Sequence, residues 1–274
     1  MTGVTVFCSD IDGTLLNPER TLSLRTIAAI RAVQEAGHSF ILCSSRPPAS
    51  MRKIEAMYGG VGEPLIAYNG GLVLSASGEV IHDIPIPSAT AIDIFGLCLK
   101  LGVHGSFYAG DEWYVWAFDR WASREITNTG ISPQEQLSAH YVESGRVSTA
   151  PPHKIMCMGD AESIDAIEAI LSTRTEVVTY RSKSTYLEIA NAECSKGAGL
   201  RSVAADMGVS AADCTFFGDN FNDLSAFAVV GTAVAVSNAQ DAVLAAATTI
   251  TPRHHDDGVA QYLEAWLESE RAGR

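Results

Sequence analysis

The beginning of the chain alternates short apolar runs with segments of helical spacing. Residues 4–9, VTVFCS, are expected to form a buried strand. Residues 23–37 place apolar side chains at helical intervals, with Ser23 as a candidate N-cap and Gly37 as a stop. The alternation continues as strand, helix and strand at residues 39–45, 47–59 and 64–71. Apolar strands separated by helices predict a parallel sheet covered on both faces.

The pattern changes near residue 85 and returns near residue 195. Between these points, pairs of adjacent strands mix with helices, which predicts an α+β region with an antiparallel sheet. From residue 195 onwards the helix and strand alternation resumes. We therefore expect an α/β fold in which a Rossmann-like core domain, residues 1–85 and 188–274, carries an inserted α+β cap domain at residues 86–187.

Composition narrows the classes of partner. The chain has 274 residues and a formal net charge of -13, and no cluster of Lys or Arg suggests a nucleic-acid partner. The apolar stretches are too short or too broken to cross a bilayer, and the N-terminus lacks the pattern of a signal peptide. The six cysteines have no C-x-x-C spacing. Four of them lie in apolar, strand-like runs and are interpreted as core residues in a reducing compartment, in preference to disulfide or zinc roles: Cys8, Cys43, Cys157 and Cys214. We expect a cytoplasmic protein, a monomer or small homo-oligomer, with no membrane partner.

Two aspartates, Asp10 and Asp12, follow the first apolar strand in the stretch FCSDIDGTLLN. They have two interpretations. An Asp-Gly sequence after a strand is usually a polar turn. Alternatively, the carboxylates form a metal and phosphate site, because ligands of open α/β sheets bind at the carboxyl ends of strands.

Other polar residues are predicted at the same edge of the sheet. Ser44 follows the second strand, Asp219 follows a later strand, and Lys196 begins a helix. Each has a plain interpretation as a turn or a helix cap. Together they match phosphoryl transfer, in which a carboxylate attacks phosphorus, a second acid moves the proton, and cations with hydroxyl donors stabilise the transferring group. Mg²⁺ suits this set because it prefers hard oxygen ligands.

These motifs resemble those of the haloacid dehalogenase superfamily. DIDGTLL, the strand ending in Ser44, the helix start at Lys196 and GDNFND occur in the order of its four motifs. The long segment between the second and third motifs matches the position of a type II cap. AYNGGLV, GDEWYVW, LEIANAECSKGAGL and DGVAQYL resemble the Cof-like group with a type IIB cap, which is similar to sugar phosphatases.

The resemblance implies a role for each matching residue. Asp10 would be the nucleophile and Asp12 the general acid and base. Ser44 and Lys196 would bind the phosphoryl group. Asp219 would bind Mg²⁺ together with the Asp10 side chain and the Asp12 backbone carbonyl.

Further positions border the expected site. The resemblance implies that Asn222 orients substrate or metal and that Asp223 supports the site from behind. Ser45 stands where the family often has glycine, and the resemblance places Arg46 near substrate or the cap, although a structural salt bridge is an equal alternative. Candidate substrate-binding residues at the end of the third strand have a plain turn as their alternative: these are Asn69 and Gly70.

The inserted region is expected to set specificity. An aromatic cluster there is interpreted as core in preference to a sugar-stacking surface, since alternation along a strand buries one face; its members are Trp113, Tyr114, Trp116, Phe118 and Trp121. Three polar groups, His104, Lys154 and Arg181, are possible substrate contacts but are expected to be ordinary surface residues.

The sequence thus predicts a Mg²⁺-dependent phosphatase acting on a small phosphorylated metabolite, with a sugar phosphate as the expected substrate and an aspartyl phosphate as the intermediate. Two alternatives stay open. One is a phosphomutase or phosphotransferase that uses the same intermediate, and the other is a metabolite-binding protein without activity. Phosphorylated vitamins are a further substrate class.

Overall fold

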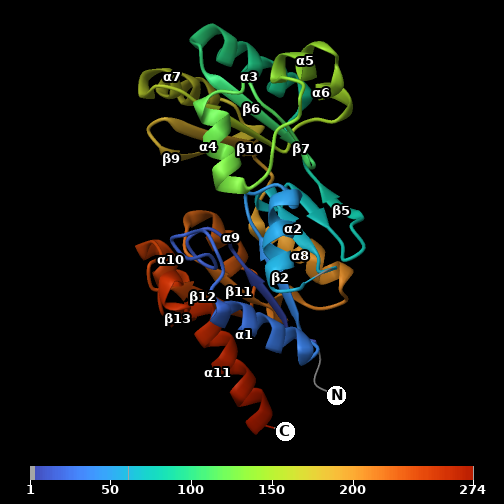
Figure 1. Ribbon diagram of the computed structural model, residues 1–274, viewed down its shortest axis with the longest axis vertical. Helices are drawn as coiled ribbons and strands as arrows, with labels where there is room; N and C mark the ends of the chain where they lie inside the picture. Colours follow the sequence, from blue (N-terminus) through green and yellow to red (C-terminus); the bar gives the residue numbers. More distant parts are fainter. Residues whose placement is uncertain (1–3, 61, 274) are drawn as a thin grey trace. The chain divides into compact units, whose positions relative to one another are not determined.

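The chain forms two compact units. The computed structural model describes residues 4–60 and 62–273. The first unit contains the described residues up to Ser45, Met51–His82 and Ser195 onwards, and the second contains Arg46–Ser50 and Asp83–Cys194. Figure 1 shows the first unit mainly in the blue and red of the two chain ends and the second mainly in the green of its middle.

A mostly parallel sheet is the centre of the first unit. Within the described residues it has eight strands in the order β13-β12-β11-β1-β2-β3-β4-β5. The strands from β13 to β3 run parallel, and β4 is antiparallel to β3. Their bounds are β1 Val6–Ser9, β2 Ser39–Cys43, β3 Leu65–Ala67, β4 Leu72–Leu74, β5 Val80–Asp83, β11 Thr215–Gly218, β12 Thr232–Val236 and β13 Thr249–Thr251.

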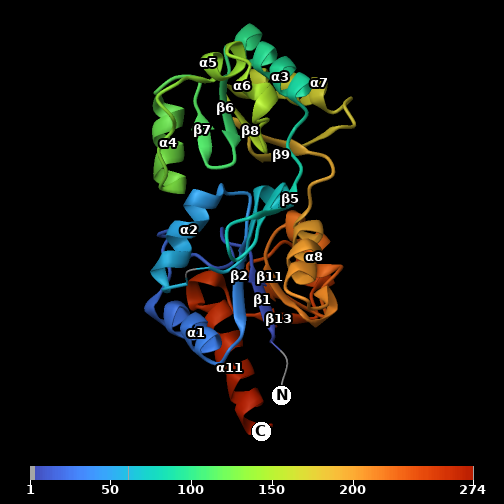
Figure 2. The same cartoon turned by 90° about the vertical axis from the view of Figure 1, so that its right-hand side faces the viewer.

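Helices cover both faces of this sheet. Figure 2 shows α8 on one side and α1 with α11 on the other. Val6 of β1 packs in one apolar cluster with Val203 of α8. The next residue, Phe7, points to the opposite face, where its ring lies 4.9 Å from that of Trp266 in α11. The helices of this unit are α1 Leu24–Glu35, α2 Pro48–Met57 (which belongs to this unit from Met51 onwards), α8 Lys196–Asp206, α9 Leu224–Phe227, α10 Asp241–Ala246 and α11 Gly258–Ala272.

Short 3-10 helices lie in several loops of the first unit: η1 Tyr68–Gly70, η2 Ala211–Asp213, η3 Phe221–Asp223 and η4 His254–Asp256. The expected cap of α1 is present, because the Ser23 side chain accepts a hydrogen bond from the backbone of Thr26. The helix opened by prolines is also present as α2, which begins at Pro48. The predicted sheet with helices on both faces is confirmed.

An antiparallel sheet forms the second unit, as the sequence predicts. Within the described residues it has five strands in the order β7-β6-β8-β10-β9. The strands are β6 His104–Ala109, β7 Glu112–Tyr114, β8 Lys154–Met158, β9 Val177–Lys183 and β10 Tyr186–Asn191. The helices are α3 Ser88–Leu101, α4 Arg120–Thr129, α5 Ser138–Glu143, α6 Arg146–Thr149 and α7 Ala161–Leu171.

The aromatic cluster is only partly core. Tyr114 and Trp116 pack in the apolar core of the second unit. Trp113 is buried as well, stacked on Tyr108 with ring centroids 5.4 Å apart. The prediction is wrong for Phe118, which is 63% exposed. The reason is that β7 ends at Tyr114, so the strand alternation does not continue to Phe118.

Two polar residues expected at the surface are buried instead. His104 lies with its Nδ1 2.9 Å from Asp119 Oδ2, and Lys154 Nζ is 3.8 Å from Glu188 Oε2. The prediction is wrong because β6 and β8 are inner strands of the sheet and every residue in both strands is buried. Arg181 is half-buried and makes ion pairs with two acidic side chains of α7.

The cysteines are core residues, as expected for the four in apolar runs. All six are buried and none forms a disulfide: Cys8, Cys43, Cys98, Cys157, Cys194 and Cys214. Among the described residues, no helix is both long enough and apolar enough to pass through a bilayer.

Candidate active site

The register of the parallel strands brings the predicted polar residues to one edge of the first unit. Ser9, the last residue of β1, pairs with Leu42 of β2 and Phe217 of β11. Asp10 therefore leaves its strand beside the points where Ser44 and Asp219 leave theirs. The backbone N–H of Asp10 also donates to the carbonyl of Phe217, 2.9 Å away.

A buried lysine joins two of the carboxylates. Lys196 is the first residue of α8 and is fully buried. Its Nζ donates to Asp10 Oδ1 at 2.5 Å and to Asp223 Oδ1 at 2.6 Å. Ser195 caps the helix by accepting from the backbone of Ala198, which fixes where the lysine leaves the helix.

Burial and charge oppose each other in this cluster. Burial raises the pKa of the Asp10 carboxyl well above its ordinary value, and the Lys196 ammonium works against that rise. Burial also disfavours the charge on Lys196, but the carboxylates of Asp10 and Asp223 hold the pKa of Lys196 well above its ordinary value. The proton of the Asp10–Lys196 pair is assigned to the lysine, because two carboxylates surround one ammonium.

Asp223 is fully engaged by its neighbours. Its Oδ1 accepts from Lys196, and its Oδ2 accepts from the backbone N–H groups of Asp219 and Asn220 at 2.9 Å each. A Cβ added to Gly218 would lie 2.6 Å from the Asp223 side chain, so glycine is needed for this approach. Asp223 therefore fixes the loop after β11 and orients Lys196.

The carboxylate of Asp219 faces the loop that follows Asp10. Its Oδ1 accepts from the hydroxyl of Thr14 at 2.9 Å. Gly13 has a φ of +92°, and a Cβ at this position would lie 2.5 Å from Asp219 Oδ2. Burial, followed by the negative charge of Asp223, raises the pKa of Asp219 to about 6.

Two supporting residues were missed by the sequence analysis, Thr14 and Asn238. The Asn238 side chain donates to the carbonyl of Gly13 at 2.8 Å and accepts from the backbone of His254 at 3.0 Å. The sequence positions of both residues could have indicated their role. Thr14 directly follows the DIDG stretch, and Asn238 follows the end of β12 at the same edge of the parallel sheet.

The acidic side chains could hold a divalent cation. Asp10, Asp219 and Asp223 each offer a carboxylate oxygen, and these oxygens lie within 4.8 Å of one another. Since both oxygens of Asp223 are already hydrogen-bonded, Asp10 and Asp219 are the better ligands. Two hard carboxylates suit Mg²⁺, which keeps several waters when bound to proteins. The residues therefore fit the metal that the sequence predicts.

Asp12 differs from Asp10, Asp219 and Asp223 because its side chain is exposed. One of its carboxylate oxygens lies 3.7 Å from Arg20 NH1, and both side chains are close to half exposed. An exposed ion pair of this kind is weak.

The remaining first-unit candidates surround the same edge. Ser44 is buried, and its carbonyl accepts from the backbone of Asn69, while Ser45 is half-buried. Asn222 Nδ2 donates to Asn69 Oδ1 at 3.1 Å. A Cβ on Gly70, whose φ is +94°, would lie 2.2 Å from the carbonyl oxygen of Ser195. The Asn-Gly turn thus packs tightly against the start of α8.

Arg46 is grouped with the second unit, as one of residues 46–50. It is buried, and its NH1 donates to the hydroxyl of Ser50 at 3.2 Å. This contact ties the loop after β2 to the first turn of α2.

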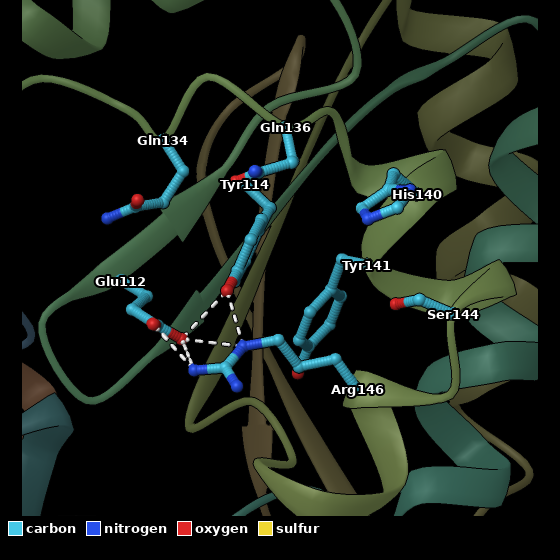
Figure 3. A pocket seen from close by; sticks show the side chains of 8 residues that line it. All are labelled: Glu112, Tyr114, Gln134, Gln136, His140, Tyr141, Ser144 and Arg146. Carbon is cyan, nitrogen blue, oxygen red and sulfur yellow. Dashed lines mark hydrogen bonds and ion pairs between the residues drawn. The ribbon is translucent and has the colours of Figure 1, made fainter.

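A separate cavity of about 360 Å³ lies in the second unit (Figure 3). Arg146 donates to Glu112 and to the Tyr114 hydroxyl, and Tyr114 in turn donates to Glu112 at 2.7 Å. The ring of Tyr141 stacks on that of Tyr114 at 4.3 Å. Polar side chains line the rest: Gln134, Gln136, His140 and Ser144. The charges of this cavity neutralise each other within one network.

The fold and the buried lysine–carboxylate cluster define an α/β enzyme for phosphoryl transfer. The family model for haloacid dehalogenase-like hydrolases matches residues 7–263, and the chain belongs to this family. A curated relative, a putative phosphatase of Haemophilus influenzae, is 30% identical over 93% of this chain and 95% of its own length. The chain is a phosphatase of this family.

Solved structures agree with this assignment. TM0651 from Thermotoga maritima superposes with a TM-score of 0.86 and 30% identity, over 96% of this chain and 97% of its own. The subclass IIB sugar phosphatase BT4131 superposes with a TM-score of 0.77 over 96% of this chain and 99% of its own. Its identity is 19%, so this second likeness concerns the fold. The predicted resemblance to the superfamily and to the type IIB cap is confirmed.

Proposed function

We propose that the chain is a Mg²⁺-dependent phosphatase that hydrolyses a small sugar phosphate through a phosphoryl group carried on Asp10. The observation that carries the proposal is the buried Lys196, which is hydrogen-bonded to both Asp10 and Asp223 at the carboxyl edge of a parallel sheet. A fully buried ammonium between two carboxylates has no need to be there for stability alone, since such clusters are costly to desolvate. The placement of Lys196, Asp10 and Asp223 at the strand ends therefore favours a catalytic role for this cluster.

In the proposed first step, a carboxylate oxygen of Asp10 attacks the phosphorus of the substrate. The bond from phosphorus to the leaving alcohol oxygen breaks, and Asp12 gives that oxygen a proton. Lys196 holds the Asp10 carboxylate in position and offsets negative charge on the transferring group. Ser44 would donate its hydroxyl to a phosphoryl oxygen.

In the second step, Asp12 takes a proton from water, and the water oxygen attacks the phosphorus of the acyl phosphate. The bond between Asp10 and phosphorus breaks, which releases inorganic phosphate and restores the carboxylate. The exposed side chain of Asp12 suits this role because it can reach water in both steps. Asn222 and Asn69, linked by a hydrogen bond, would orient the substrate.

Magnesium fits beside this machinery. We propose that Asp10, Asp219 and the backbone carbonyl of Asp12 hold it. When bound, Mg²⁺ would neutralise charge on the phosphoryl oxygens. Thr14 and Asn238 position the loop and the carboxylate on which this depends.

The inserted region, proposed as residues 86–187, would select the leaving group.

Six buried cysteines without a disulfide support the proposed cytoplasmic location, where thiols stay reduced. These two proposals concern substrate choice and compartment, and the chemistry at Asp10 does not depend on them.

Turnover of p-nitrophenyl phosphate tests the chemistry. Asp10→Asn is expected to lower kcat at least about a thousandfold, since the nucleophile is lost. EDTA is expected to stop the wild type, and added Mg²⁺ to restore it. Asp206→Asn, the same change at an exposed position of α8, is the control and should keep full activity. Near-normal turnover by Asp10→Asn would show that the nucleophile is assigned wrongly.

A screen of phosphorylated metabolites tests the substrate class. Free phosphate released from a monophosphate supports hydrolysis, whereas an isomeric sugar phosphate would show that the chain is a mutase. Sugar phosphates are expected to be turned over with a higher kcat/KM than pyridoxal phosphate or flavin mononucleotide. The reverse order would contradict the proposed substrate class.

A further inference from the structure

A second candidate site lies wholly within the second unit. The ring of Trp121, in the first turn of α4, meets the ring of Tyr186 in β10 edge to face, with centroids 5.5 Å apart. Beside this contact is a cavity of about 440 Å³, lined by Arg120, Trp121, Arg124 and Thr185. We call it the arginine–tryptophan pocket. Figure 1 labels α4 and β10, the two elements that carry these rings.

Positive charge collects around this pocket. Arg120 lies over the Trp121 ring at 4.6 Å from its centroid, and Arg124 lies over the Tyr186 ring at 5.1 Å. Lys183 Nζ is 5.7 Å from the centroid of the same tyrosine. Among the described residues, none of these three cations has a carboxylate within 4.0 Å.

Other arginines of the second unit behave differently. Arg146, Arg174 and Arg181 each make an ion pair with at least one carboxylate. The whole chain has 32 acidic and only 19 basic residues. Three neighbouring cations without a carboxylate partner among the described residues are therefore not what the composition leads one to expect, and their charge is left for a ligand.

The position of the two arginines works against the helix itself. Arg120 is the first residue of α4 and Arg124 follows one turn later. The Asp119 carboxylate caps this N-terminus by accepting from the backbone N–H groups of Trp121 and Ala122, so the helix dipole is already offset there. Like charges four residues apart repel each other, and this repulsion remains. An anion bound between the two guanidinium groups would relieve it.

The aromatic rings hold the guanidinium groups in an orientation that suits such an anion. A guanidinium over a ring face is held in a defined plane by a cation–π interaction. Its N–H groups at the edge of that plane remain able to donate to two oxygens at once, which is the geometry of a bound phosphate. The rings also offer a surface on which an attached apolar or planar group can pack.

We propose that the arginine–tryptophan pocket binds an oxyanion of the phosphate class. The anion would lie between Arg120 and Arg124, with Lys183 adding charge from the end of β9. Two sources supply this chemistry: a second phosphate group on the substrate, or a separate phosphate that binds without being turned over. The site does not require the chemistry at Asp10.

Titration with inorganic phosphate tests the site directly. Nitrogen-15 NMR of the arginine side chains is the readout, with the Nε–H signals of Arg120 and Arg124 assigned through Arg120→Gln and Arg124→Gln. Both signals are expected to shift and to saturate as phosphate is added. Because these signals are local, phosphate bound at the active site does not produce the same effect.

The double variant Arg120→Gln/Arg124→Gln is expected to weaken phosphate binding at the pocket at least about tenfold, measured on the backbone amide signal of Thr185, which lines the cavity. Arg201→Gln/Arg271→Gln loses the same charge at exposed positions and should bind as the wild type does. An unsaturable shift in the wild type, or one reproduced by sodium chloride of equal ionic strength, would overturn the proposal.

Kinetics separate the two sources. If the pocket binds a second phosphate of the substrate, the double variant should lose at least about tenfold in kcat/KM for fructose 1,6-bisphosphate and keep its kcat/KM for p-nitrophenyl phosphate. If it binds a separate phosphate, both values should stay unchanged while the NMR shift is lost. An equal fall for both substrates would contradict the proposal, since it would indicate general damage to the enzyme.

Discussion

The variant Lys196→Met tests how the buried cluster is held together. It replaces the ammonium with an unbranched apolar side chain and leaves Asp10 and Asp223 buried beside it. Lys196 is fully buried and both of its hydrogen bonds are short, at 2.5 and 2.6 Å, so solvent cannot replace them. Removing one partner of a buried ion pair costs about 3–5 kcal/mol. We expect a loss of this size in the free energy of unfolding.

Urea unfolding measures this loss, followed by circular dichroism and tryptophan fluorescence. Trp266 packs edge-on against Phe7 of β1, so its emission reports on the first unit. The matched control is Lys100→Met at an exposed lysine near the end of α3, which should change the free energy of unfolding by less than about 1 kcal/mol.

A second substitution separates charge from packing. In Lys196→Met/Asp223→Asn, one unpaired buried charge is removed, while the amide oxygen of the new side chain would still accept from the loop backbone. We expect about 1–3 kcal/mol of the lost stability to return without any return of activity. Wild-type stability of Lys196→Met would refute the reasoning, because it would mean that the carboxylates do not need the ammonium.

Three more perturbations address the loop, the metal and the second unit. Gly13→Ala should lower the free energy of unfolding by about 1–3 kcal/mol more than Gly37→Ala in urea, because both glycines have a positive φ but only Gly13 faces Asp219; equal losses would contradict this. Asp219→Asn should raise the Mg²⁺ concentration for half-maximal activity at least about tenfold, and an unchanged value would remove Asp219 from the ligand set. Arg146→Gln should leave the urea midpoint of unfolding close to the wild-type value and keep activity, since its ion pair with Glu112 is partly exposed; a large fall in that midpoint would be inconsistent with this.

Much of the fold follows from the sequence because its signals are local. The alternation of apolar runs and helical spacing predicts the parallel sheet and the inserted antiparallel one, and Ser23 marks the start of α1. Phe118 shows where local pattern fails. The strand before it ends at Tyr114, and nothing in the stretch EWYVWAF indicates this early end.

Burial of polar groups is harder to predict, because it depends on partners far along the chain. His104 is buried beside Asp119, and Lys154 lies beside Glu188 on a neighbouring strand. Neither partner is recognisable from spacing, so both residues look like surface groups in the sequence.

The candidate site was predictable to the extent that residues share strand ends. Asp10 and Asp219 follow neighbouring parallel strands and therefore lie close together, although about 200 residues separate them in the sequence. The engagement of both Asp223 oxygens was not predictable, because it depends on backbone N–H groups of a tight loop after Gly218.

The central claim is that phosphorus becomes bonded to Asp10 during turnover. Acid quenching within a single turnover, followed by peptide mass spectrometry, tests it most directly. The account predicts one phosphoryl group on the peptide that contains Asp10, located at Asp10 and absent when Asp10→Asn is treated in the same way. A phosphoryl group on another residue, or full turnover with no phosphorylated peptide at any quench time, would contradict the account.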